Sequence, residues 1–454
     1  MASILSVIFS IIYTIVIVAV IVLVIEQQRE PVWSFAWAMT VIFIPVAGLI
    51  LFILFGYRPA RKRLVAPPRI ERSERIPFIT LLENNSDAKL ALHNNLDVLH
   101  NGDQTFASIA QALESARESI HIEYYIFCED EVGNYIAEQL ERKAREGVEV
   151  RLIFDAVGSW KLSKEFISRL RASGVEVGRF SPITFPYFTH YLNYRNHRKI
   201  AIIDGSVGFI GGMNIANRYL RGVPWGAWRD TSLCISGMAV QGLQTVFLMD
   251  WCFVTGQQVS DTVYFPLQDN MGHSQIQIVT SKPVGRWREI MQGYLHAIAS
   301  ARRYIYIQTP YFMPTEQILT ALQTAALSGV DVRIMLPWKS DSRVVQMCSR
   351  SYLRDVMEAG VKVLFYHHGF LHAKTLVIDD RISSIGSTNI DFRSFEYNFE
   401  VNAFMYDSDT ALRLRDIFLA DQRHCTHISS QRWARRSPWR KVEESVLRLF
   451  APLM

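Results

Sequence analysis

Hydrophobic residues dominate the first 57 positions of the chain. Residues 2–25 contain no charged side chain, and the stretch 32–57 is also uncharged. A helix needs about 20 apolar residues to cross a bilayer, so the pattern predicts an α-helical transmembrane hairpin over residues 1–57. Basic residues stay on the cytoplasmic side, and they follow the second stretch, whereas the short segment between the stretches is net acidic. We therefore expect a multi-pass protein whose remaining chain faces the cytoplasm.

From residue 96 onward, short apolar runs of strand length alternate with segments of helical periodicity, and the pattern occurs twice. The sequence ALESARESIHIEYYIF, which begins at Ala112, aligns without gaps to AIASARRYIYIQTPYF from Ala297. Strands that alternate with helices indicate an α/β layer fold. We expect two tandem α/β/α domains, at residues 96–270 and 271–430, related by a pseudo-twofold axis. Residues 58–95, with several prolines and arginines, are expected to form a basic linker.

Each half contains the same motif of charged and polar residues. The copies span residues 197–214 and 372–389, and both read His-x-Lys-x4-Asp-x6-Gly-[Gly/Ser]-x-Asn, with the same offset between every pair of matching positions. The His and the Lys are separated by a single residue on an apolar run, so they point to the same face of a strand. The pairs are His197 with Lys199 and His372 with Lys374.

The aspartate of each copy stands at an odd offset from its histidine, which turns it away from the His-Lys face of a regular strand. Asp204 and Asp379 are therefore interpreted either as structural residues in turns between two strands or as residues that support the site indirectly. An imidazole and an ammonium can bind a phosphate together, and two such pairs facing each other can act on it. One imidazole would attack phosphorus, the other would protonate the leaving oxygen, and the lysines would stabilise the charge.

The duplicated motif resembles the signature of the phospholipase D superfamily, over about residues 95 to 454. The resemblance implies that the site lies at the interface of the two halves. The implied catalytic residues are His197, Lys199, Asp204, His372, Lys374 and Asp379, with Asn214, Asn389 and Ser387 at the phosphate. The first copy has Gly212 where the second has Ser387, so this resemblance gives a hydroxyl contact to phosphate only in the second half.

Two carboxylates are candidates for orienting the histidines. Glu400 lies downstream of His372 and matches the superfamily's downstream acid, which orients the motif histidine. Asp230, downstream of His197, is the candidate in the first half. A carboxylate on the far ring nitrogen fixes the tautomer and stabilises the imidazolium. The alternative for each is a surface salt bridge with a neighbouring arginine.

Three features favour a lipid substrate. The first is the apolar N-terminus, and the second is an aromatic run at residues 183–192, directly before the first motif and suited to acyl chains. The third is the segment 431–454, in which basic residues stand beside an apolar stripe. The stripe consists of Trp439, Val442, Val446, Leu449 and Phe450. A basic amphipathic helix suits an anionic membrane interface, although docking on the protein is an equally open reading.

The whole chain resembles bacterial cardiolipin synthases of the phospholipase D type, for example in the segment Trp228-Arg229-Asp230-Thr231 and in the ending Arg448–Leu453. That family joins two phosphatidylglycerols into cardiolipin and glycerol through a phosphatidyl-histidine. By this resemblance His197 is the nucleophile and His372 the acid and then the base. It also implies a bacterial cytoplasmic membrane location, with phosphatidylglycerol and anionic lipids as partners. Hydrolysis of phospholipids by the same residues is the alternative.

Composition bounds the other possibilities. A net charge of +5 over 454 residues is small for the basic groove that a nuclease needs, so no nucleic-acid partner is expected. The five cysteines lack metal-ligand spacing, and there is no Walker-type or dinucleotide fingerprint, so neither a metal nor another cofactor is expected. Both His-Lys pairs are intact, which disfavours a non-enzymatic lipid-binding scaffold. A homo-oligomer is compatible with the sequence.

Overall fold

The computed structural model describes residues 2–26, 31–44, 46–56, 76–181, 193–283 and 285–451. The chain divides into two compact units. Unit 1 comprises Met1–Ala66 with Ile183–Asn193, and unit 2 comprises Pro67–Pro182 with Tyr194–Met454.

Unit 1 is helical where it is described. It contains α1 (Ala2–Glu26), α2 (Pro31–Phe43), α3 (Ala47–Leu51) and a short π-helical segment, η1 (Phe52–Gly56). Val20, Val24, Val41 and Phe52 are buried together. The continuous helix expected over residues 32–57 is interrupted, because α2 ends at Phe43 and Val46 takes a positive φ of 61°.

The transmembrane hairpin expected from the sequence is not supported. Within the described parts of the chain, no helix combines the length and the apolarity that crossing a membrane requires.

Unit 2 is built on one sheet of fifteen strands that carries both halves of the repeat. The first half contributes β1 (Ala91–Leu99), β2 (Ser119–Tyr124), β3 (Glu149–Asp155), β4 (Glu176–Phe180), β5 (Lys199–Ile203), β6 (Val207–Gly211) and β8 (Ser232–Ser236). The second half contributes β9 (Ser274–Ser281), β10 (Tyr304–Gln308), β12 (Asp331–Pro337), β13 (Lys362–Tyr366), β15 (Thr375–Ile378), β16 (Ile382–Gly386), β18 (Glu400–Met405) and β19 (Cys425–His427).

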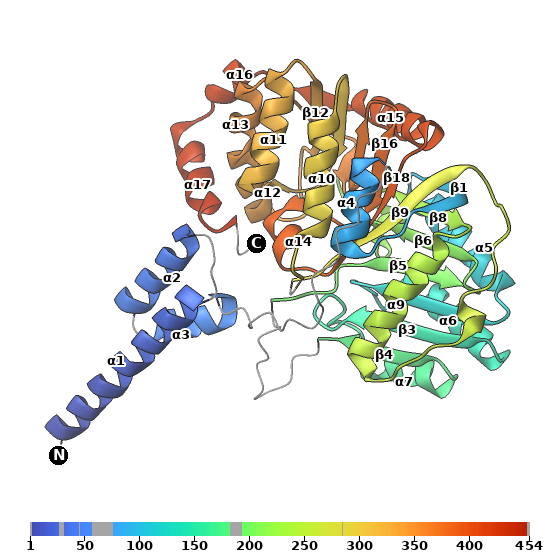
Figure 1. Ribbon diagram of the computed structural model, residues 1–454, viewed down its shortest axis with the longest axis horizontal. Helices are drawn as coiled ribbons and strands as arrows, with labels where there is room; N and C mark the ends of the chain where they lie inside the picture. The colour runs from blue at the N-terminus through green and yellow to red at the C-terminus, as the bar shows by residue number, and fades with distance from the viewer. Residues whose placement is uncertain are drawn as a thin grey trace. The chain divides into compact units, whose positions relative to one another are not determined.

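The strand order shows the duplication directly. Read from one edge to the centre, the first half runs β4-β3-β2-β5-β6-β8-β1, and the second half runs β13-β12-β10-β15-β16-β18-β9 inside the edge strand β19. The halves meet where β1 and β9 pair antiparallel, as Figure 1 shows. In the first half β2 pairs in parallel with β3 and antiparallel with β5, which carries the motif lysine. In the second half β10 pairs in the same way with β12 and with β15, which directly follows the motif lysine. The expected tandem α/β domains are confirmed.

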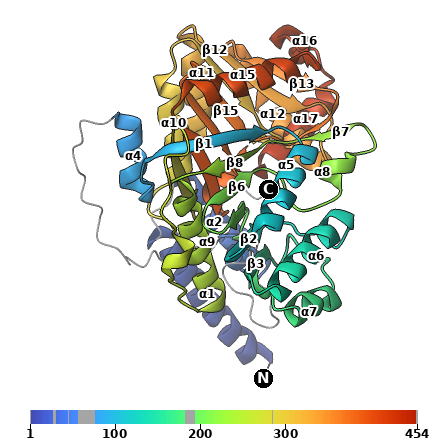
Figure 2. The same ribbon diagram turned by 90° about the vertical axis from the view of Figure 1, so that its right-hand side faces the viewer.

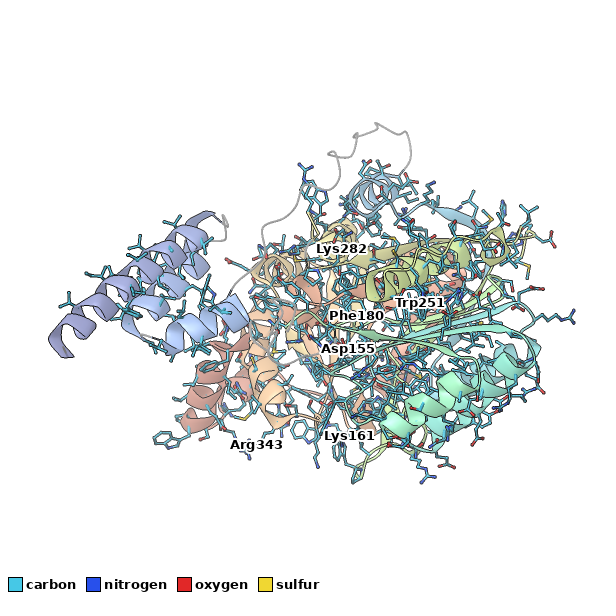
Figure 3. The ribbon with its side chains drawn as sticks, turned by 90° about the horizontal axis from the view of Figure 1, so that it is seen from below. Asp155, Lys161, Phe180, Trp251, Lys282 and Arg343 are labelled. Atoms are coloured by element: carbon cyan, nitrogen blue, oxygen red, sulfur yellow. The ribbon has the colours of Figure 1, made fainter. Side chains whose placement is uncertain are left out.

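Helices cover both faces of the sheet (Figures 1 and 2). On one face α9 (Val240–Thr255) and α15 (Ser408–Gln422) share a single core that draws residues from both halves. Phe180 and Trp251 belong to this core (Figure 3). The other face carries α5 (Gly102–Ser115), α6 (Glu131–Arg145) and α7 (Lys164–Ala172) in the first half, and α10 (Glu289–Ser300), α11 (Glu316–Leu327), α12 (Arg343–Ser351) and α13 (Leu353–Glu358) in the second.

Short elements complete the unit. They are α8 (Arg218–Arg221), β7 (Ala227–Arg229), η2 (Thr262–Tyr264), β11 (Phe312–Met313), β14 (Gly369–Leu371), β17 (Ile390–Asp391), α14 (Phe392–Glu396), α16 (Ser430–Ala434) and α17 (Pro438–Arg448). Part of the predicted linker is also ordered, because α4 (Pro77–Ser86) buries Phe78 and Leu82 against Tyr294 of α10. The arginine-rich residues 58–75 lie outside the described residues.

Candidate active site

The two motif histidines stand at points where the backbone of one half pairs with the backbone of the other. Asn196 forms a parallel bridge to Phe399, and the amide of His197 donates to the carbonyl of Phe399 at 2.9 Å. In the equivalent arrangement β14 pairs in parallel with β7, and the amide of His372 donates to the carbonyl of Arg229 at 2.7 Å. Each histidine is therefore fixed beside a segment of the opposite half.

These cross-pairings decide which carboxylate each histidine contacts. Glu400 directly follows Phe399, and its two carboxylate oxygens lie 3.0 and 3.1 Å from Nδ1 of His197. Asp230 directly follows Arg229, and its Oδ2 lies 2.6 Å from Nδ1 of His372. The sequence predicts that each acid orients the histidine of its own half, and this prediction is wrong. The two acids are exchanged between the halves.

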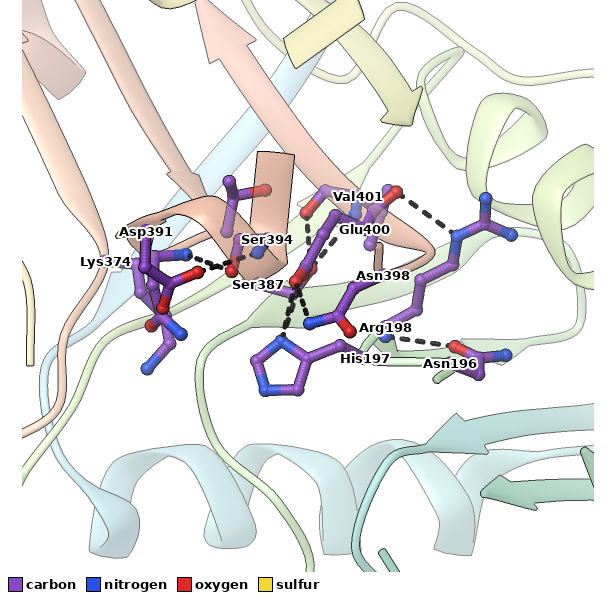
Figure 4. Close-up of polar contacts among 12 residues, drawn as sticks. Asn196, His197, Arg198, Lys374, Ser387, Asp391, Ser394, Asn398, Glu400 and Val401 are labelled. Carbon is purple, nitrogen blue, oxygen red and sulfur yellow. Dashed lines mark hydrogen bonds and ion pairs between the residues drawn. The ribbon is translucent and has the colours of Figure 1, made fainter. Parts of the chain in front are cut away.

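Glu400 is fully buried and held by three polar neighbours (Figure 4). Besides His197, the amide of Asn398 donates to Oε1 at 3.1 Å, and the hydroxyl of Ser387 donates to Oε2. Burial by itself raises the pKa of a carboxyl group, but His197, Lys199 and the Ser387 hydrogen bond outweigh it, and the pKa of Glu400 lies below its ordinary value. Glu400 thus stays negatively charged beside His197. The hydroxyl of Ser387, which is predicted to contact phosphate, donates to this carboxylate.

The glycine that replaces Ser387 in the first copy has a structural reason. A Cβ on Gly212 would lie 2.9 Å from Oδ2 and 3.0 Å from Cγ of Asp230, and closer still to Oδ1. The carboxylate therefore occupies the space that any larger side chain would need. Its Oδ1 accepts a hydrogen bond from the Thr231 amide at 2.8 Å, which fixes the orientation of Asp230 toward His372.

The two motif lysines are almost completely buried beside the histidines. Lys199 donates to the carbonyl of His197, and Lys374 donates to the carbonyl of His372. Burial lowers the pKa of Lys199 to about 7, with Glu400 opposing the shift and Lys374 adding to it. Burial likewise lowers the pKa of Lys374 to about 8, against the opposing charge of Asp230. Because the charge of one lysine acts on the other, an anion between them would be stabilised by both.

The histidines are neutral at pH 7 before an anion binds. Burial lowers the pKa of His197 to about 4 against the opposing charge of Glu400, and burial together with Lys374 lowers the pKa of His372 to about 4. Each imidazole contacts its carboxylate through Nδ1, and a carboxylate only accepts, so we assign the hydrogen to Nδ1 and the lone pair to Nε2. In the second half Nζ of Lys374 also lies 3.0 Å from Nδ1 of His372. An Nε2 with its lone pair available is the atom that a nucleophile or a general base needs.

Aromatic rings enclose the two histidines differently. The ring of Tyr125 lies 5.0 Å from that of His197, and Lys199 lies 5.3 Å from the same tyrosine ring. His372 has rings on more than one side, with that of Trp228 at 5.3 Å and that of Tyr219 at 6.1 Å. These rings exclude water and thereby contribute to the lowered pKa values of the neighbouring basic groups.

The two predicted phosphate-binding asparagines are used differently. In the first half Oδ1 of Asn214 accepts from the Ile126 amide at 3.0 Å, and its Nδ2 donates to the Tyr219 hydroxyl at 2.8 Å. Both polar ends of Asn214 therefore hold the loops around the site. Asn389 is also buried, and among the described residues its Oδ1 has no hydrogen-bond partner. Asn389 thus has a side-chain oxygen without a hydrogen-bond partner among the described residues, whereas both polar ends of Asn214 are bonded.

The two motif aspartates lie at the far ends of the motif strands and do not join the site. Asp204 follows β5, and its carboxylate accepts from the amides of Arg117, Glu118 and Ser119 at 2.8–3.2 Å. Asp379 follows β15 and binds three consecutive amides of the second half, from Arg302 to Tyr304, at 2.6–2.8 Å. Both have a positive φ, 51° and 54°. The odd offset predicted this structural role correctly, and their place in the implied catalytic set is corrected.

Two buried arginines support the acids and were missed from the sequence. Nε of Arg198 donates to the backbone carbonyl of Glu400 at 3.2 Å, and its Nη1 pairs with Asp250. Arg229 donates from Nη1 to the backbone carbonyl of Asp230 at 2.6 Å and pairs with Asp421. The available signal was adjacency, since Arg198 directly follows His197 and Arg229 directly precedes Asp230 in the sequence.

Asp155 anchors the chain just before the first motif. It lies at the carboxyl end of β3 (Figure 3) and accepts from the Asn196 amide at 3.0 Å. The aromatic run at 183–192, predicted to meet acyl chains, lies outside the described residues.

The sequence matches two known protein families and is similar to named relatives. Residues 109–241 and 294–422 match the family described as cardiolipin synthase, PLD-like domain, and residues 14–56 match the family described as phospholipase D-nuclease N-terminal. The chain is 42% identical to the cardiolipin synthase of Geobacillus kaustophilus, over 94% of this chain and 90% of that protein. It is 40% identical to the cardiolipin synthase of Listeria innocua, over 94% of this chain and 95% of that one.

Among solved structures, the fold is similar to that of a phosphatidylserine synthase from Haemophilus influenzae. The TM-score is 0.63 at 13% sequence identity, and the match covers 83% of this chain and 98% of that one. At such low identity the likeness concerns the fold alone.

Proposed function

The chain belongs to the cardiolipin synthase family of phospholipase D-like proteins, and we propose that it condenses two phosphatidylglycerols into cardiolipin and glycerol at the paired histidines. The observation that carries the proposal is the exchange of carboxylates between the halves, with Glu400 on His197 and Asp230 on His372. Each pair is a base with its orienting acid, and two such pairs beside two lysines suit the cleavage and formation of a phosphodiester.

In the first step His197 is the nucleophile. Its Nε2 bonds to phosphorus while the bond from phosphorus to the glycerol headgroup oxygen breaks, and His372 gives that oxygen the proton of its Nε2. Binding of the negatively charged phosphodiester raises the pKa of both histidines. His372 can hold this proton because its Nδ1 lies 2.6 Å from Asp230, whose negative charge favours the imidazolium.

In the second step the headgroup hydroxyl of another phosphatidylglycerol takes the place of the released glycerol. His372, now neutral, accepts the hydroxyl proton while the oxygen attacks phosphorus, and the bond from phosphorus to His197 breaks. Lys199 and Lys374 stabilise the phosphoryl oxygens in both steps. One phosphodiester replaces another, so the exchange draws on no external source of energy.

The proposal extends to where the enzyme works. We propose that unit 1 attaches the chain to the bacterial cytoplasmic membrane, with unit 2 on the cytoplasmic side. Support comes from the absence of charge in residues 2–25 and from outward apolar side chains such as Ile15, Phe35 and Phe43, which are 62–72% exposed. Extraction of membranes at alkaline pH tests the attachment, because a chain recovered entirely in the supernatant would contradict it.

The experiment for the reaction uses purified full-length protein and phosphatidylglycerol labelled in its headgroup, in mixed micelles without added metal or nucleotide. The expected products are cardiolipin and free glycerol. Phosphatidic acid with glycerol, and no cardiolipin, would mean that water is the acceptor and that the protein is a hydrolase.

Matched histidine variants connect the products to the site. His197→Asn and His372→Asn should each lower the rate by at least about 10³-fold, the scale seen when one member of a base–acid pair is removed. His273→Asn, which changes a histidine in the loop before β9, should retain the wild-type rate. Equal activity of all three variants would contradict the two-histidine mechanism.

A further inference from the structure

The C-terminal helix α17 is attached to unit 2 by its polar side. Glu444, only 5% exposed, forms an ion pair with Arg436 at 2.6 Å. One turn later Arg448 pairs with Asp355 of α13 at 2.8 Å, and its guanidinium lies 4.1 Å from the centre of the Tyr352 ring. The docked stripe is completed by Leu447, which is partly buried, and by Ala451, which is fully buried.

The apolar side of α17 points away from the rest of unit 2. Trp439 is 82% exposed and Leu449 76%, and the other apolar side chains of the same face are about half exposed. The outward set consists of Trp439, Val442, Val446, Leu449 and Phe450. With about 3.6 residues per turn, this set lies on the face opposite to the docked stripe. A helix on the surface of a soluble protein normally has the reverse orientation.

The charges around this apolar face have one dominant sign. Across residues 430–451 the exposed basic side chains are Arg432, Arg435, Arg440 and Lys441. The exposed acidic side chain in the same stretch is Glu443, since Glu444 is buried against Arg436. A surface with an apolar strip, an exposed tryptophan and an excess of basic groups fits an anionic interface.

The helix packs on α12, and α12 begins just after a residue whose charge acts on the active site. α17 packs on α12, where the Cys348 thiol contacts the Leu447 carbonyl at 3.5 Å. At its other end α12 begins shortly after Asp341, whose negative charge raises the pKa of His372. Arg343, in the first turn of α12, is exposed (Figure 3). α17 thus packs on a helix that begins two residues after Asp341, whose charge acts on His372.

We propose that α17 binds the surface of an anionic phospholipid bilayer, with Trp439, Val446 and Leu449 at the boundary between headgroups and acyl chains. The proposal rests on the proposed function in one respect, because an enzyme whose two substrates are anionic lipids must reach a surface rich in them. Docking by α17 would hold α12, and with it the loop that carries Asp341, at that surface. Apolar area buried in lipid and the attraction of the basic groups both contribute to such binding.

Photocrosslinking in the full-length protein tests which molecule covers this face. Leu449→benzoylphenylalanine places the probe on the outward face, and Leu447→benzoylphenylalanine places it on the docked side as the matched control. The protein is reconstituted in nanodiscs of phosphatidylcholine alone or with phosphatidylglycerol, irradiated, and mapped by mass spectrometry. We expect lipid adducts at position 449, several-fold more with phosphatidylglycerol, and adducts to α12 or α13 at position 447.

Other adducts at position 449 would overturn the proposal. An adduct to residues of unit 1 would mean that another part of the chain covers the face, and an adduct between two copies would mean an oligomer contact. Lipid adducts that do not depend on phosphatidylglycerol would overturn the preference for an anionic surface.

An activity measurement separates this inference from the proposed function. Val442→Glu with Leu449→Glu should raise the apparent KM for phosphatidylglycerol in vesicles about tenfold and leave the rate in detergent micelles unchanged. An unchanged KM in vesicles would refute the role of α17. If the wild type formed no cardiolipin but still crosslinked to lipid at position 449, the proposed reaction would fail and the membrane contact would stand.

Discussion

Gly212→Ala tests the exchange of carboxylates with a single methyl group. Carbon atoms pack at about 3.5–4.0 Å, and the new Cβ would lie 3.0 Å from Cγ of Asp230 and nearer to its Oδ1, so the carboxylate must move by about 1 Å. Asp230 is fully buried and is held at the Thr231 amide and at His372, so it has little room to move. A misplacement of about 1 Å in a catalytic group costs about 10²-fold in rate.

The assay is the initial rate of cardiolipin formation at saturating phosphatidylglycerol, together with the melting temperature. We expect kcat of Gly212→Ala to fall about 10²-fold. Gly208→Ala, on β6 just before Gly212, is the matched control. Its Cβ would meet the end of the Leu243 side chain at 2.7 Å instead of a catalytic group. The control should lose stability and keep its kcat. A folded Gly212→Ala enzyme with a rate within threefold of wild type would refute the catalytic role of Asp230.

Three further predictions follow from the same contacts. Glu400→Gln keeps the shape of the side chain but removes its charge, so kcat should fall about 10³-fold; an unchanged kcat in a folded variant would contradict the role of the carboxylate. Lys199 has a pKa of about 7 and is charged below that pH, so kcat/KM should decline as the pH rises through 7 to 8. Lys199→Arg should shift this decline to higher pH, because a guanidinium stays charged there. An identical pH profile in both enzymes would exclude Lys199 as the cause of the decline. Asp204→Asn should lower the melting temperature by weakening its contacts with three backbone amides and leave kcat within a few-fold, and a large loss of kcat with intact stability would mean that the residue acts in catalysis.

Much of the fold could be predicted because it follows from local patterns. The matched copies of the motif and the repeated strand and helix segments required two similar halves, and the sheet repeats the same strand order in each. Strand alternation also gave the structural role of Asp204 and Asp379, since the parity of an offset is a property of the backbone alone. Local rules sufficed wherever a residue's partner lay on the same or a neighbouring strand.

The pairing of acids with histidines could not be predicted in this way. It is fixed by backbone contacts between segments far apart in the sequence, His197 with Phe399 and His372 with Arg229, and no spacing within one half reveals them. The role of Ser387 follows from the same fact, because its hydroxyl bonds to an acid whose histidine lies in the other half.

The C-terminal segment shows the same division between local and tertiary information. The amphipathic pattern of α17 identified its two faces, because helical periodicity is a property of the segment itself. Only the tertiary contacts of Glu444 and Arg448 show which face is docked on the protein.

The central claim is that the phosphatidyl group passes through His197, and trapping the intermediate tests it most directly. Wild-type protein is mixed with phosphatidylglycerol labelled at phosphorus, quenched within milliseconds in alkali, which preserves phosphohistidine, and digested for peptide mapping. The account predicts label on the peptide that contains His197, with its loss in acid and its absence in His197→Asn. Label on the His372 peptide instead, or cardiolipin formed at the normal rate with no labelled histidine, would contradict the account.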